Sequence, residues 1–386
     1  MKILAILFKR IPLTLFLARV LYTINWFNVS SIFYFISLDF HLDISSLGLI
    51  TTSFIIGVGI FQIPAGILAA KFGSRRLSIF GILFSSLMVI ISGLLEDIVL
   101  IAILRFLVGI GMACFFGPSI TLITKFLGEK NTGLGVGILN SAHAIGALIG
   151  IFGWIPIADL IGWHLAIIIG GVCGVIITIF MELNLINDLK TRIKIEIRDL
   201  KTVLLNRSLI TLGFALLGFQ TGASLTLTFM VLFLIEKLNV EPVLAGFFGS
   251  LSLITGIIVS PLFGKIYNKI HNTKKLLFIC SLISASSIML LYIHSIYVVI
   301  CSILVAGIFL SMGFVVVYAK AKQDYGIKIE YQTLAISFVN GISLTGSFWI
   351  PIVFSYFVHE YGYDFAWIMA GILIIFLSLP LLKLKT

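Results

Sequence analysis

Two arginines lie inside long apolar stretches of this sequence, Arg19 within residues 11–38 and Arg105 within residues 98–124. An ionised side chain in the hydrocarbon region of a membrane costs at least about 2.5 kcal/mol unless it faces a cavity or a partner, so such residues are candidates for function. No Asp or Glu lies near the middle of an apolar stretch. A positive cavity of low dielectric attracts anions. The two arginines therefore predict a binding site for a small, organic anion.

Each arginine also has an interpretation without a ligand. Arg105 could be hydrogen-bonded to backbone carbonyls of a neighbouring helix, and Arg19 could extend to the nearby lipid headgroups. The spacing around Arg19 favours a cavity wall, because polar and aromatic residues follow it at intervals of three, four, seven and eleven and so share one helix face. These residues are Tyr22, Thr23, Trp26 and Ser30.

Other polar residues inside the apolar stretches could complete a binding site. We expect substrate contacts from Asn25, Trp26, Asn28, Gln62, Asn140, Gln220 and Asn340, together with the two arginines. Each amide could instead hold neighbouring helices together, which is a common role of Asn and Gln in membranes. We expect about half of these residues to line the cavity.

One histidine, His143, lies in the middle of an apolar stretch, one turn after Asn140. A histidine is the side chain whose ordinary pKa lies nearest neutrality, so His143 could carry a coupling proton. Its alternative role is a hydrogen-bonded packing residue. Paired catalytic carboxylates, nucleotide-binding loops and metal-ligand spacings are missing from the sequence, so we expect no enzyme activity, no cofactor and no metal site.

The composition predicts an all-α protein that crosses a membrane many times. The chain has 386 residues, of which 60% are hydrophobic and 11% charged, and its mean hydropathy is +1.19. Apolar runs long enough to span a bilayer are separated by charges and turns. They predict twelve transmembrane helices, at 11–38, 44–70, 77–95, 98–124, 132–158, 163–183, 209–235, 242–268, 275–294, 296–319, 331–358 and 364–382.

The distribution of basic residues predicts the topology. With a cytoplasmic N-terminus, 23 of the 26 Lys and Arg residues fall on the inner side, as the positive-inside rule requires. We therefore expect a multi-pass protein of the cell membrane with both termini in the cytoplasm. Because topology explains the net charge of +10, we expect the lipid bilayer and a small molecule as partners, no nucleic acid, and a monomer.

The chain divides into two similar halves. We predict a six-helix bundle at 1–183, a cytoplasmic linker at 184–208 and a second six-helix bundle at 209–386. The linker alternates charged and apolar residues and could form a helix on the membrane surface, or simply a solvated loop. An even number of spans restores the chain direction, so the bundles form parallel repeats with a binding site at their seam.

A basic, glycine-rich turn between the second and third spans recurs 198 residues later. The first copy includes Gly66, Lys71, Gly73, Arg75 and Arg76, and the second includes Gly264 and Lys269. Such a turn between two membrane helices lies at the cytoplasmic surface. We expect the two copies to act as a symmetric pair of gating elements.

This turn, with Arg105, Gly109, Gly111 and Pro118 on the fourth span, resembles the major facilitator superfamily over essentially the whole chain. The resemblance implies twelve helices and alternating access. Arginines on the first and fourth spans resemble the anion:cation symporter branch, which carries organic anions such as sugar acids. The family usually has an Asp where this chain has Ala70, and the second copy has Asn268. We expect Glu129, Glu182, Asp324 or Glu330 to replace that carboxylate by contacting Lys71, Arg75 or Arg76.

These observations favour a secondary active transporter of a small organic anion, a symporter or antiporter. The 13% aromatic content leaves a second hypothesis, efflux of several drugs or other lipophilic compounds. A third is a membrane receptor or scaffold that has a transporter's fold and transports nothing. Counterflow in vesicles separates this third hypothesis from the others, because a scaffold exchanges no solute.

Overall fold

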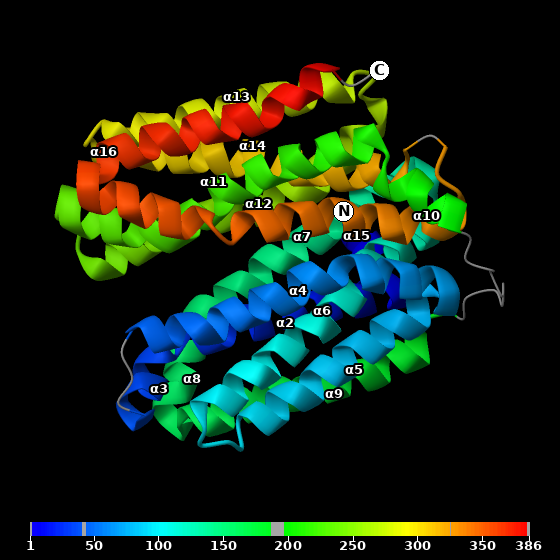
Figure 1. Ribbon diagram of the computed structural model, residues 1–386, viewed down its shortest axis with the longest axis horizontal. Coiled ribbons are helices and arrows are strands. Elements are labelled where there is room, and N and C mark those ends of the chain that lie inside the picture. Colours follow the sequence, from blue (N-terminus) through cyan, green and yellow to red (C-terminus); the bar gives the residue numbers. More distant parts are fainter. Residues whose placement is uncertain (1, 41–43, 187–196, 325, 384–386) are drawn as a thin grey trace.

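The computed structural model describes residues 2–40, 44–186, 197–324 and 326–383, and these are almost entirely helical. Figure 1 shows the helices running side by side in two bundles, α2 to α9 below and α11 to α16 above. The longer helices are α2 (Arg10–Ser31), α4 (Ile44–Phe72), α5 (Ser74–Ser92), α6 (Ile98–Leu127), α7 (Thr132–Leu148), α9 (Trp163–Asn184), α11 (Arg207–Leu238), α12 (Pro242–Ile266), α13 (Thr273–Met289), α14 (Ile296–Lys322), α15 (Gln332–Ser347) and α16 (Ile350–Ser378). The shorter ones are α1 (Lys2–Leu7), α3 (Phe33–Phe40), α8 (Trp154–Ile161) and α10 (Ile197–Leu204).

Ten stretches of the described residues are long and apolar enough to cross a membrane. One of them, Ile329–Lys383, contains two of the predicted spans, because the structure joins them through a turn at Gly362. The predicted first span corresponds to α2 followed by α3 and is not among the ten. The fold is the expected all-α arrangement of twelve membrane helices in two repeats.

Three predicted helices are interrupted. The span predicted at 11–38 breaks at Ile32 between α2 and α3, and the span predicted at 132–158 contains a π-helical turn at Ile149–Gly153. The span predicted at 331–358 ends at Ser347, and α16 starts again with a proline in its first turn. Proline has no backbone N–H for the preceding turn, so it begins a helix more easily than it continues one.

The repeat is visible in the backbone. Gly162 has a φ of 84° between α8 and α9, and Gly362 has a φ of 83° within α16. An L-residue with a side chain rarely adopts this conformation, so glycine stands at both turns. In each case the next residue, Trp163 or Tyr363, is a buried aromatic that starts the following helical segment.

The two ends of the molecule are distinguishable. We call the end that carries α10 and the C-terminus the α10 end, and the end that carries α3 and α8 the α8 end (Figure 1). Residues 187–196 of the predicted linker lie outside the described residues. Its last part forms α10, whose Asp199 makes an ion pair of 2.8 Å with Lys328 of the second bundle.

Candidate functional site

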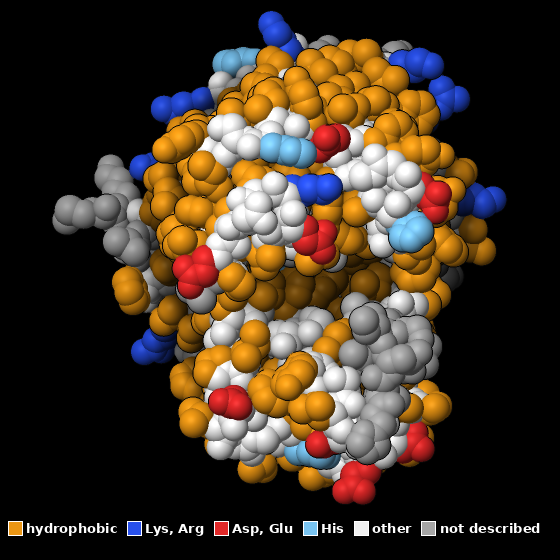
Figure 2. Space-filling model, turned by 90° about the vertical axis from the view of Figure 1, so that its left-hand side faces the viewer, with side chains coloured by type: hydrophobic (Ala, Val, Ile, Leu, Met, Phe, Trp, Pro, Cys, Tyr) orange, Lys and Arg blue, Asp and Glu red, His pale blue; other side chains and the backbone are white. Residues whose placement is uncertain are grey.

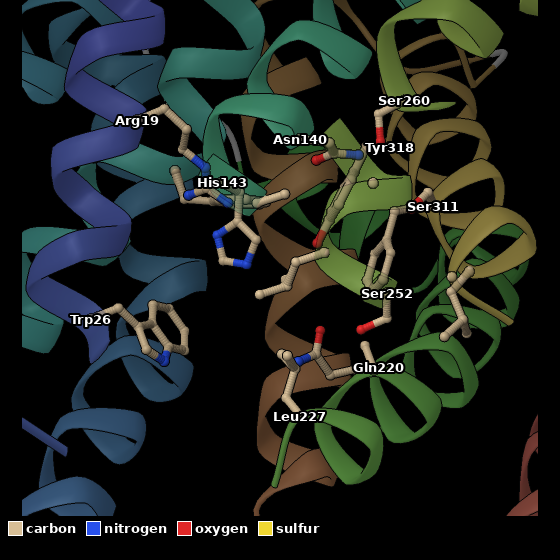
Figure 3. Close-up of a pocket in the computed structure, with 18 of the residues that line it drawn as sticks. Arg19, Trp26, Asn140, His143, Gln220, Leu227, Ser252, Ser260, Ser311 and Tyr318 are labelled. Carbon is tan, nitrogen blue, oxygen red and sulfur yellow. The ribbon is translucent and has the colours of Figure 1, made fainter. Parts of the chain in front are cut away.

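A cavity lies at the seam between the two bundles and opens at the α8 end. Figure 2 looks onto that end and shows a hollow between the upper and lower bundles, with hydrophobic side chains at its bottom. The empty space of the cavity and its opening measures about 1030 Å³, part of which is open solvent. Its wall combines residues from both bundles, as a site at the axis of a two-fold repeat requires. Figure 3 shows many of these residues converging from opposite sides.

Arg19 on α2 reaches this cavity (Figure 3). The residue is only 6% exposed. Its guanidinium carbon lies 4.3 Å from the centre of the Tyr22 ring and 4.7 Å from that of Phe116. Aromatic faces stabilise a cation in this arrangement. They hold the guanidinium at the wall, and Nη1 has no hydrogen-bond partner among the described residues.

His143 on α7 faces the same cavity beside Arg19 (Figure 3). Its Nδ1 lies 2.9 Å from the Thr23 hydroxyl, and that hydroxyl donates a hydrogen bond of 3.0 Å to the Arg19 carbonyl. A hydroxyl has one hydrogen to donate, so Thr23 accepts from the Nδ1–H of His143. This network assigns the tautomer whose Nε2 is a hydrogen-bond acceptor.

The second bundle supplies the opposite wall. The hydroxyl of Tyr318 on α14 donates a hydrogen bond of 2.7 Å to the side-chain oxygen of Asn340 on α15. The Tyr318 ring packs edge-on against Phe116, with 5.2 Å between the ring centres, so the walls meet near Arg19. Gln220 on α11 lies across the cavity from Arg19 in Figure 3. Further polar side chains on this wall are Ser252, Ser260 and Ser311.

Arg105 on α6 is not among the residues that line the cavity. It is 2% exposed and donates hydrogen bonds to the backbone carbonyls of Asn25 at 3.0 Å and Trp26 at 3.2 Å. Its guanidinium also lies 4.5 Å from the centre of the Phe54 ring. These contacts bind both terminal nitrogens of the guanidinium to a neighbouring helix, while Nε has no hydrogen-bond partner among the described residues. They connect α6 to α2 at Trp26, which does line the cavity.

Five of the nine expected substrate contacts line the cavity: Arg19, Trp26, Asn140, Gln220 and Asn340. Three amides lie elsewhere. Asn28 donates to Asn25 at 3.1 Å, and Asn25 donates to the Gly170 carbonyl at 3.3 Å, so this pair joins α2 to α9. Gln62 is fully buried on α4 and lies against Gly341 of α15.

The sequence analysis did not select Tyr318 or Phe116. Tyr318 could have been found, because a tyrosine inside an apolar stretch needs a partner for its hydroxyl. Phe116 has no such signal. It is one of 33 phenylalanines in the chain, and only the fold places it over Arg19.

The bundles are in close contact at the α10 end. A Cβ atom added to Gly66 of α4 would lie 2.7 Å from the Leu334 Cα of α15. The equivalent contact of the repeat joins α12 to α7, where a Cβ on Gly264 would lie 3.1 Å from the Leu134 Cα. Leucines 134 and 334 are 200 residues apart, and the two glycines are 198 apart. The two copies of the basic turn thus begin with equivalent helix crossings between the bundles, which only a residue without a side chain allows.

Neutral hydrogen bonds join the bundles beside these crossings. Thr333 of α15 lies within hydrogen-bond distance of Thr121 at 2.8 Å and of Ser74 at 3.2 Å. On the other side of the axis, the Asn268 amide donates to the Lys130 carbonyl. Asn268 occupies the position in the second copy that corresponds to the family's usual Asp. Through this hydrogen bond it contacts the other bundle.

Among the candidates for a substitute carboxylate, Glu182 contacts the basic turn. Its side chain forms an ion pair of 2.7 Å with Arg75, whose guanidinium also donates 2.8 Å hydrogen bonds to the carbonyls of Glu182 and Leu185. Arg75 and Glu182 belong to the first bundle and Leu185 directly follows α9, so this contact fixes the basic turn against α9. Asp324 instead accepts hydrogen bonds from Asn206 and Ser208 in the second bundle.

Comparison with known proteins identifies the family. The profile of the Major Facilitator Superfamily matches residues 15–326. The chain belongs to the Major Facilitator Superfamily. Its relatives within the superfamily include the probable galactarate/D-glucarate transporter GudP of Bacillus subtilis, 24% identical over 84% of this chain and 80% of that one. The 4-hydroxybenzoate transporter PcaK of Pseudomonas aeruginosa is 23% identical over 38% of this chain and 33% of its own.

Solved structures of the superfamily have the same fold. The human organic anion transporter MFSD10 superposes with a TM-score of 0.78 at 13% identity, over 96% of this chain and 99% of that one. Membership of the superfamily, with the twelve-helix architecture, makes this chain a multi-pass membrane transporter of small molecules and not an enzyme.

Proposed function

We propose that this transporter moves a small organic anion across the cell membrane by alternating access, with Arg19 as the ligand of its negative charge. The observation that carries the proposal is the buried guanidinium of Arg19 at the seam, with Nη1 free of described partners. A buried cation without a counter-ion is costly, so an anion that pairs with it gains binding free energy. The names of the relatives GudP and PcaK, which refer to organic acids, agree with this substrate class.

The shape of the cavity supports alternating access. The bundles separate at the α8 end and pack tightly at the α10 end, as in one of two states that rocking of the halves would interconvert. The positive-inside distribution supports a cytoplasmic position for the α10 end. With this topology, both termini are cytoplasmic and the cavity faces outward.

His143 is the proposed carrier of a coupling proton. Its Nε2 is an acceptor in the assigned tautomer, and the residue lies on the cavity wall beside Arg19. Protonation at Nε2 would place a second positive charge at the site and strengthen anion binding. Arg105 has a positioning role, because its hydrogen bonds hold the segment of α2 that contains Trp26.

Thermal shift on purified protein tests the anion site, since a ligand that binds the native state raises its melting temperature. We expect benzoate to stabilise the wild type and to lose this effect in Arg19→Gln. Arg10→Gln is the matched control, because it removes the same charge from an exposed position on the same helix. Equal stabilisation of wild type and Arg19→Gln would refute the role of Arg19. Stabilisation by lipophilic cations but by no carboxylate would favour multidrug efflux instead.

A further inference from the structure

The charge of the cavity wall limits the charge of the substrate. Among the described residues that line the cavity, Arg19 is the one Lys or Arg, and none is Asp or Glu. Arg105, the second intramembrane arginine, is turned toward two backbone carbonyls of α2. The wall thus offers one full positive charge, and its remaining polar groups are amides, hydroxyls and an imidazole.

We infer that the substrate is a monoanion with a compact apolar body, an inference that rests on the proposed function and makes its substrate class more specific. A transporter that works by alternating access must enclose its substrate between the two open states. Arg19 and a monoanion form a neutral pair inside this enclosure. While the His143 imidazole is neutral, a dianion would leave one carboxylate unpaired in a low-dielectric space, and burying an unpaired charge is strongly unfavourable.

The chemistry of the wall defines the body of the substrate. Aromatic side chains line the cavity from both bundles, namely Tyr22, Trp26, Phe27, Phe116, Phe314 and Tyr318. Leucines from α11, α12, α14 and α15 extend this surface. Apolar surface gains about 25 cal/mol for each Å² that leaves water, so an apolar body next to the carboxylate would add affinity.

The polar groups of the opposite wall do not change this charge count. Asn340 already accepts the hydrogen bond of Tyr318, and Ser252 donates to the backbone carbonyl of Gly249. Gln220 remains as a neutral group across the cavity from Arg19 (Figure 3). A neutral amide can bind a hydroxyl or carbonyl substituent of the substrate, but it cannot neutralise a second carboxylate.

Matched ligands test the inference. Dissociation constants of purified full-length protein are measured by calorimetry at neutral pH for benzoate against terephthalate, and for hexanoate against adipate. Each pair shares its body and differs by one carboxylate. We expect the monoanion of each pair to bind at least tenfold more tightly. D-Gluconate, a monoanion with six carbons and many hydroxyls, should bind at least tenfold more weakly than hexanoate.

A second cation placed across the cavity should reverse the charge preference. We expect Gln220→Arg to improve terephthalate binding at least tenfold, whereas Tyr361→Arg should change it less than twofold. Tyr361 is a suitable control because its side chain is exposed near the α8 end, outside the cavity. If Gln220→Arg does not fold, the ligand pairs on the wild type still decide the question.

The results that overturn the inference differ from those that overturn the proposed function. Equal affinity for the two members of each pair would refute the monoanion, and gluconate binding as tightly as hexanoate would refute the apolar body. In both cases anion binding through Arg19 would stand. If no carboxylate binds and Arg19→Gln changes nothing, the proposed function itself fails.

Discussion

Substituting Gly66 should open the α10 end of the transporter. Gly66 lies on α4 where this helix crosses α15, and an added Cβ would meet the Leu334 Cα at 2.7 Å and the Ser337 Cβ at 3.2 Å. The first contact is with backbone, which cannot rotate away. Gly66→Ala therefore requires the two bundles to separate locally at this crossing.

The size of the effect follows from the packing. Overfilling a close-packed contact typically costs about 1–3 kcal/mol. The helix-propensity gain of alanine over glycine, about 1 kcal/mol, applies equally to both states of the transporter and does not shift their ratio. If the bundles part at this crossing in the state that is open at the α10 end, that state does not carry the strain. A difference of about 1–3 kcal/mol then shifts the equilibrium by roughly 5- to 150-fold toward that state.

Distances between spin labels measure this shift directly. Labels at the exposed residues Arg76 and Lys275, in a background without the four native cysteines, report the separation of the two bundles at the α10 end. Gly59→Ala is the matched control. It lies on the same helix and the same seam, but its Cβ would have its nearest neighbour, the Thr345 backbone nitrogen, at 3.8 Å. Gly66→Ala should add a longer-distance population that Gly59→Ala lacks. Identical distance distributions would refute the idea that this crossing closes the α10 end.

Three further predictions test individual residues. Arg105→Lys should lower the melting temperature, because lysine cannot reproduce the two hydrogen bonds to α2. It should change the benzoate dissociation constant less than Arg19→Lys does. A larger change in this dissociation constant for Arg105→Lys than for Arg19→Lys would place Arg105 at the substrate. His143→Gln should abolish the dependence of uptake on a proton gradient but keep counterflow, and uptake that still responds to the gradient would exclude His143 as the proton carrier. Glu182→Gln should change the free energy of unfolding by less than about 1 kcal/mol, because this carboxylate is 59% exposed. Arg75→Gln should lower the free energy of unfolding more in the same denaturation experiment, because it also loses two hydrogen bonds to backbone carbonyls.

Hydrophobic patterning was sufficient to predict the fold. The length of the apolar runs gave the helices, and the recurrence of Gly66 at Gly264 indicated the repeat that the structure shows as two equivalent helix crossings. Helix interruptions were harder to predict. The π-helical turn at Ile149–Gly153 has no marked local signal, because its residues are as apolar as those around it.

The site was predictable only in part, because a sequence shows which residues share a helix face but not what that face contacts. Arg19 and Arg105 have the same chemistry and similar apolar surroundings. Their difference arises from α2, which presents two carbonyls to Arg105 and places Arg19 on the seam. Asn25 and Asn140 differ for the same reason: the first faces α9 and the second faces the other bundle across the cavity.

Counterflow in proteoliposomes tests the central claim most directly. Vesicles that contain the purified transporter and a high internal concentration of benzoate are placed in dilute labelled benzoate. The wild type and Arg10→Gln should accumulate label transiently, and Arg19→Gln should stay at the level of empty vesicles. Counterflow by Arg19→Gln at the wild-type rate, or no counterflow by the wild type with any carboxylate, would contradict an alternating-access carrier that holds its anion on Arg19.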